Sequence, residues 1–139
     1  MAGLAMFDQT PPAAGQRAAL ADPYGTAAVE PRARAWLEAN CSHCHNPNGF
    51  ASSTHLYLTT DVTTPVDLGV CRPPNAAGPG SGGRLYDVVP GHPELSVMTF
   101  RISATMAGLK MPPIPIQLVD QGGADVVAQW ITGLPGNCN

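Results

Sequence analysis

Glycine and proline interrupt this 139-residue chain so often that long regular elements are excluded. The sequence contains 15 glycines and 15 prolines, whereas the two residue types together make up roughly 12% of an average protein. They show no three-residue period, so the chain is not collagen-like. Because few regular elements provide little packed interface, a small domain of this kind needs a disulfide, a metal or a cofactor to stabilise it. The four cysteines can supply such a staple.

The charge and hydropathy patterns exclude several classes of partner. Ten acidic and seven basic residues give a net charge of −3, and Lys110 is the only lysine. No basic stripe is present, so we expect no nucleic-acid binding. No apolar run reaches about 18 residues, so we expect no membrane span. Residues 1–7 lack the charged and apolar regions of a signal peptide.

The length predicts one folded domain preceded by an irregular arm. We assign the arm to residues 1–27 and the domain to residues 28–139. Pro11, Pro12, Pro23 and Gly25 break the arm. Its apolar residues allow it either to pack on the domain or to serve as a linker.

The spacing of apolar residues predicts an all-α fold with three short helices and long loops. The first helix begins near residues 29–31 and presents Ala33, Trp36, Leu37 and Asn40 on one face. The second covers residues 93–102, and the third covers residues 120–132. A left-handed glycine, Gly133, is expected to end the third helix. Residues 56–58 form a candidate short strand, and the rest of 46–90 is expected to be loop.

The motif Cys41-Ser42-His43-Cys44-His45 follows directly after the first predicted helix. This C-x-x-C-H spacing is the attachment signal for a c-type haem. Two thiols separated by two residues can add across the two vinyl groups of the porphyrin. The next residue, His45, then supplies a nitrogen ligand to the iron. A backbone carbonyl near Pro47 is expected to accept a hydrogen bond from the other ring nitrogen.

Two other chemistries use a C-x-x-C pair. A structural zinc site needs a second closely spaced ligand pair, but Cys71 and Cys138 are far apart in the sequence. A thioredoxin-like dithiol needs a βαβ pattern, which is absent here. Haem is therefore the favoured interpretation, with zinc and a redox dithiol as alternatives.

The order of these motifs resembles a class I cytochrome c domain over residues 28–134. The features that carry the resemblance are Trp36 and Leu37 before the C-x-x-C-H motif, then Met111-Pro112-Pro113, then a last helix ending near Trp130-Ile131. The resemblance implies a single covalent haem and a close crossing of the first and last helices. Similar Pro/Gly-rich single-haem domains occur in multidomain secreted or periplasmic bacterial proteins. Some of those proteins also carry carbohydrate-binding modules or dehydrogenase domains.

Class I domains usually place a methionine sulfur on the second axial position of the iron. Met111 is the favoured ligand because the two prolines after it stiffen its loop. Met106, His55 and His92 are the alternatives. Methionine ligation raises the reduction potential relative to two histidines.

Two cysteines remain after the haem has taken Cys41 and Cys44. Covalent haem attachment takes place in an oxidising compartment outside the cytoplasm, where disulfides persist. A Cys71–Cys138 bridge would therefore form, and it would stabilise the fold by about 3 to 4 kcal/mol. Free or intermolecularly paired thiols are the alternative.

Arginine is the residue type suited to pairing with the haem propionates. Arg101 is the selected candidate, with Arg84 and Arg72 as alternatives. Four aromatic residues could contact the ring or fill the core: Trp36, Tyr57, Tyr86 and Phe100.

With His45 and Met111 both bound, the iron has no open site, so we expect an electron carrier rather than an enzyme. The expected protein is a periplasmic or secreted monomer that exchanges electrons with a redox partner protein or with another domain of its own chain. An open-site haem with peroxidase or gas-binding activity is one alternative. A structural module appended to a carbohydrate-active protein is the other. The haem-free chain is expected to be largely unfolded.

Overall fold

The computed structural model describes residues 9–10, 12–16, 19–75, 77–114 and 117–139. Within these residues the regular structure is helical, and the only β pairings are two isolated bridges. The all-α prediction is therefore confirmed for this part of the chain. The α-helices are α1 (Val29–Cys41), α2 (Val97–Ser103) and α3 (Gln121–Gly133). Short 3₁₀ turns are η2 (Ala14–Gln16), η3 (Ser52–Thr54), η4 (Gly78–Ser81) and η5 (Pro93–Leu95).

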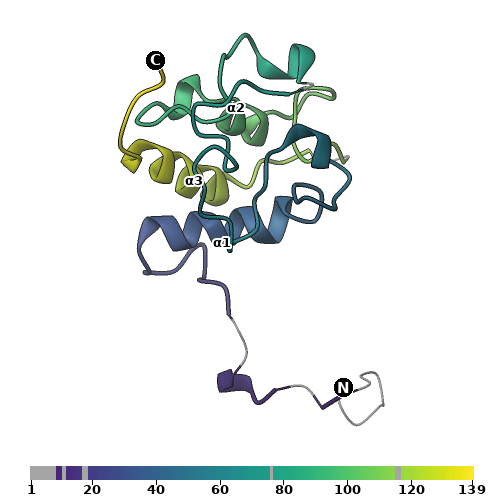
Figure 1. Cartoon of the computed structure of the whole chain (residues 1–139), viewed down its shortest axis with the longest axis vertical. Helices are drawn as coiled ribbons and strands as arrows, with labels where there is room; N and C mark the ends of the chain where they lie inside the picture. The colour runs from purple at the N-terminus through teal and green to yellow at the C-terminus, as the bar shows by residue number, and fades with distance from the viewer. Residues whose placement is uncertain (1–8, 11, 17–18, 76, 115–116) are drawn as a thin grey trace.

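Helices α1 and α3 pack against each other, and α2 lies on the side of α3 away from α1 (Figure 1). Leu37 of α1 and Val127 and Ile131 of α3 are fully buried in the shared core. At Gly123 of α3, an added Cβ would lie 1.9 Å from Trp36 Nε1 of α1, so only glycine fits at this position. The resemblance led us to expect that the first and last helices pack together, but not this glycine. We call the contact between the two helices the helix joint.

Asp120 completes the helix joint from the N-terminal end of α3. Its carboxylate accepts hydrogen bonds from Gly123 N at 3.0 Å, Trp36 Nε1 at 2.7 Å and Tyr24 Oη at 2.5 Å. These donors hold the pKa of Asp120 below its ordinary value, with the Tyr24 hydroxyl contributing most. One N-cap side chain thus connects the arm, α1 and α3.

The arm contacts the domain where it enters α1. In addition to the Tyr24 hydroxyl, the Pro23 carbonyl accepts a hydrogen bond from Arg32 at 3.3 Å. The described parts of the chain before Pro23 extend away from the helices (Figure 1). Residues 1–8, 11 and 17–18 of the predicted arm lie outside the described residues.

The second predicted helix is divided in two, which corrects the sequence prediction. Ser96 is extended between η5 and α2, with φ −90° and ψ 133°. Its buried hydroxyl donates to the His92 carbonyl and accepts from Val89 N, both at 2.9 Å. These two hydrogen bonds hold Ser96 in the extended conformation, so the helix is interrupted there. The Val89 partner comes from the preceding loop, so local helix propensity does not predict it.

Two smaller predictions were also wrong. Residues 56–58 form no strand, although Tyr57 N donates to Asp67 O at 2.8 Å and Leu58 N donates to His45 O at 2.9 Å. Gly133 is the last residue of α3 and is not left-handed. Asn40 is exposed and lies with Leu37 on the side of α1 that lines the cavity described below. No helix in the described residues is long and apolar enough to cross a membrane.

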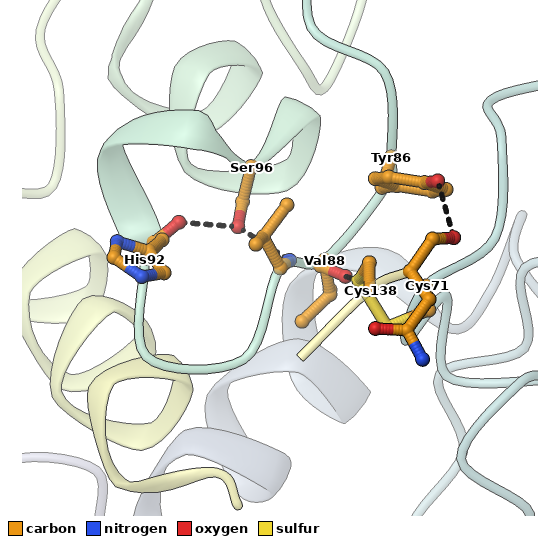
Figure 2. The surroundings of a disulfide bond; sticks show 8 residues. Cys71, Tyr86, Val88, His92, Ser96 and Cys138 are labelled. Atoms are coloured by element: carbon orange, nitrogen blue, oxygen red, sulfur yellow. Dashed lines mark hydrogen bonds between the residues drawn. A yellow bond between two sulfur atoms is a disulfide. The ribbon is translucent and has the colours of Figure 1, made fainter. Parts of the chain in front are cut away.

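Cys71 and Cys138 are bonded, with an S–S distance of 2.11 Å (Figure 2). The bridge joins residues 67 positions apart and fixes the tail after α3 to the long central loop. Cys71 N donates to Val88 O at 2.9 Å, so the same loop is tied to a second segment beside the bridge. The part of the chain around the disulfide contains little regular helix. Its loops are held together by the bridge and by hydrogen bonds between loop segments.

Candidate functional site

The main cavity of the described structure has a volume of about 600 Å³. This size is typical of sites that enclose a small molecule or cofactor. Its walls come from the C-terminal end of α1, the segment that follows it, α2 and the loop around residues 108–114. The apolar lining includes Leu37, Leu56, Leu58, Val97, Met98 and Ile102.

All five predicted cofactor-binding residues line this one cavity. They are Cys41, Cys44, His45, Arg101 and Met111. They come from three segments that are distant in the sequence, so the convergence is a property of the tertiary fold.

The end of α1 explains why the three motif residues share one side. Cys44 N and His45 N both donate to the Cys41 carbonyl, at 3.1 and 2.9 Å. The helical turn thus continues past the last residue of α1. Residues three and four positions apart lie on the same face of such a turn, so Cys41, Cys44 and His45 reach the same cavity.

A close backbone approach stabilises this turn. The chain returns past Cys44 at Gly49, where an added Cβ would lie 2.3 Å from the Cys44 carbonyl oxygen. Two residues later, Ala51 donates its N–H to the same carbonyl at 3.0 Å. Glycine is therefore required at position 49 for steric reasons.

The Cys41 and Cys44 thiols are half-buried and are not bonded to each other. Burial, together with the neighbouring Cys44 thiol, raises the pKa of Cys41 to about 12. Cys41 is therefore held as a neutral thiol on the cavity wall. Cys71 and Cys138 are bonded to each other and provide no second thiolate pair for zinc.

The His45 ring contacts residues 54–56, a segment that also lines the cavity. Thr54 Oγ1 lies 3.4 Å from His45 Nδ1, and the Leu56 backbone also hydrogen-bonds the ring. Burial lowers the pKa of His45, which favours the neutral imidazole, and the Leu56 bond opposes this effect. Neutral imidazole is the form that binds metals. We predicted that a backbone carbonyl near Pro47 accepts the hydrogen bond of the ring, and this position was wrong. The backbone partner is Leu56, because the chain turns back after the motif and brings residues 54–56 beside the ring.

Met111 lies on the loop that forms another part of the wall. Its backbone N–H donates to the Arg101 carbonyl at 2.9 Å, which ties the loop to α2. The alternative ligand Met106 is 67% exposed and is not part of the lining. His55 and His92 are also exposed and lie off the cavity. Met98 lines the cavity but is a core residue of α2, as its position on the helix predicts.

The wall also carries the guanidinium of Arg101 and the carboxylate of Asp87. Asp87 Oδ2 accepts a hydrogen bond from Arg72 Nη2 at 2.9 Å. Burial raises the pKa of Asp87 in spite of this partner. Arg72 is therefore engaged with Asp87, and it also donates to the His55 carbonyl.

The other predicted contacts fall away from the cavity. Arg84 lies over the Phe100 ring, 4.1 Å from its centroid, and it is not a lining residue. Of the four aromatic candidates, none is among the described residues that line the cavity. Trp36 belongs to the core of the helix joint.

Sequence reasoning missed Asp87, Thr54 and Asn75, which also line the cavity. Only Asp87 could have been found from the sequence, because it is a single charged residue between apolar neighbours in residues 85–89. Thr54 and Asn75 lie in loops without a periodic pattern, so nothing local indicates where their side chains point. Within the described residues, no three His, Cys, Asp or Glu side chains gather as a metal site.

We compared the chain with models of protein families, with curated proteins and with solved structures, and found no match.

Proposed function

We propose that this chain is a c-type cytochrome that binds one covalent haem and carries single electrons. The observation that supports the proposal is the convergence of Cys41, Cys44, His45 and Met111 on one cavity. When bound, the haem supplies an iron that gains and loses one electron. The donor set fits this group, because two thiols, an imidazole and a thioether are what it requires.

The two thiols hold the group in place. Each thiol would add across a vinyl double bond, so that sulfur would bond to one carbon and the thiol hydrogen would pass to the other. No oxidant or reductant is consumed. Because Cys41 and Cys44 are half-buried beside the cavity, the resulting thioethers fix the group against the end of α1.

His45 and Met111 would hold the iron of the bound group from the protein side. With both residues bound, the iron would offer no site to a substrate, and this favours an electron carrier over an enzyme. Leu37, Leu58 and Ile102 line the cavity and would shield the bound group from water. Arg101 is the lining residue that can pair with a propionate.

The helix order supports a class I cytochrome c fold, in which the first and last helices cross as α1 and α3 do here. The Cys71–Cys138 bridge supports a periplasmic or secreted location, where disulfides persist. We propose a monomer whose electron partner is another protein or another domain of the parent chain.

Carbon monoxide added to the reduced holoprotein tests whether Met111 fills the second axial position. The wild type should bind it slowly and show the far-red sulfur-to-iron band when oxidised. Met111→Ala should lose the band and bind carbon monoxide at once, because one position is open. Met106→Ala is the matched control and should resemble the wild type, since Met106 is exposed and off the cavity. Rapid binding by the wild type would overturn the carrier and favour the gas-binding or peroxidase alternative.

A further inference from the structure

Arg101 is attached to the Met111 loop through both its backbone and its side chain. Its carbonyl accepts from Met111 N at 2.9 Å, and its Nε donates to the Leu109 carbonyl at 3.1 Å. Within the loop, Leu109 N and Lys110 N both donate to the Met106 carbonyl at 3.1 Å. Residues 106–111 thus form a turn whose end is tied to α2 at Arg101.

The guanidinium of Arg101 is fixed from the other side by η4. A Cβ added at Gly80 would lie 3.0 Å from Arg101 Cζ and from Nη1. Gly80 is buried, so the guanidinium packs against bare backbone at this position. The side chain therefore has a defined place between η4 and the Met111 loop, although its stem is long and flexible.

We propose that Arg101 is a positioning residue that holds the Met111 loop so that the thioether faces the cavity. The inference rests on the proposed function, because it concerns the strength of the bond between Met111 and the haem iron. A single thioether is a weak ligand, so its occupancy depends on a loop that cannot move away. Arg101 provides this restraint in addition to any pairing with a propionate.

Arg101→Lys separates the two roles. Lysine keeps the positive charge that a propionate needs, but it has no Nε–H in a rigid planar fork. The hydrogen bond to Leu109 is then lost, and a bond to a charged donor corresponds to ~10- to 100-fold in an equilibrium constant.

The measurement is imidazole titration of the oxidised holoprotein, followed through the far-red band. We expect Arg101→Lys to retain covalent haem and to bind imidazole ~10- to 100-fold more tightly than the wild type. Gly80→Ala should weaken the Met111 bond in the same direction, because it displaces the guanidinium while Arg101 itself is kept. If Arg101→Lys fails to fold, the imidazole affinity of Gly80→Ala still tests the positioning role.

Arg84→Lys is the matched control. Arg84 Nε also donates to a backbone carbonyl, that of Glu94 at 3.0 Å, but this residue is off the cavity. Its imidazole affinity should equal that of the wild type. Wild-type affinity in both Arg101→Lys and Gly80→Ala would overturn the positioning role. A wild type without the far-red band would instead overturn Met111 ligation, and with it the proposed function.

Discussion

The helix joint and the cavity wall are built in opposite ways. In the joint, two regular helices meet and bury their apolar side chains against each other. Leu37, Val127 and Ile131 are fully buried, and Asp120 accepts from three donors. The cavity wall is made largely of loops, and it presents two free thiols and an imidazole to one shared space.

This difference shows where the glycines and prolines act. At the joint, Gly123 lets two helices approach, so glycine improves packing there. Around the cavity, residues such as Gly49 and Gly80 let backbone pass close to the Cys44 carbonyl and the Arg101 guanidinium. The loops are therefore shaped by specific contacts. That a haem-free chain is largely unfolded stays a prediction.

Removing the disulfide should give the largest change on the cavity side. The Cys71→Ala/Cys138→Ala double variant should lose about 4 kcal/mol of unfolding free energy, because the unfolded chain gains the entropy of a large open loop. Urea unfolding of the holoprotein measures the loss. Reduced wild type should match the double variant, and a loss below about 1 kcal/mol would show that the bridge contributes little.

Overpacking the joint should have the next largest effect. Gly123→Ala places a Cβ against the Trp36 indole and should cost about 3 kcal/mol, since neither helix can move freely. Gly133→Ala is the control in the same helix, because nothing lies within 4 Å of its added Cβ. It should change stability by less than about 1 kcal/mol. Equal urea midpoints for the two variants would refute the close crossing.

The two carboxylates should differ in the sign of their pH dependence. The pKa of Asp120 is lowered in the folded state, so its stabilisation is present above the ordinary value of 3.8 and is lost as pH falls. Asp120→Asn should cost about 2 kcal/mol at neutral pH and less in acid.

The pKa of Asp87 is raised by burial, so its titration destabilises the fold as pH rises above 3.8. Between about pH 3 and pH 6, stability should therefore rise more steeply with pH in Asp87→Asn than in the wild type. In Asp120→Asn it should rise less steeply. Slopes that shift in the same direction would contradict the assigned environments. Asp125→Asn, at an exposed residue of α3, is the control for removing a charge.

Local patterns predicted the two helices of the joint and the motif half of the site, whereas the pairing of these helices was expected only from the resemblance. The face of α1 and the turn from Cys41 to His45 depend on near neighbours, so spacing alone reveals them. The break at Ser96 depends on Val89 from another segment, and the polar wall depends on Arg72 reaching Asp87. Such contacts arise only when loops are brought together, and a single sequence has no period that reports them.

Covalent haem attachment is the most direct test of the proposed chemistry. The chain should be produced in cells that carry the machinery for attaching haem to C-x-x-C-H motifs, and its intact mass measured after denaturation. We predict a gain of one haem per chain, kept in Cys71→Ala/Cys138→Ala and absent from Cys41→Ala/Cys44→Ala. A wild-type chain of unmodified mass, or haem retained after both motif cysteines are removed, would contradict the proposal.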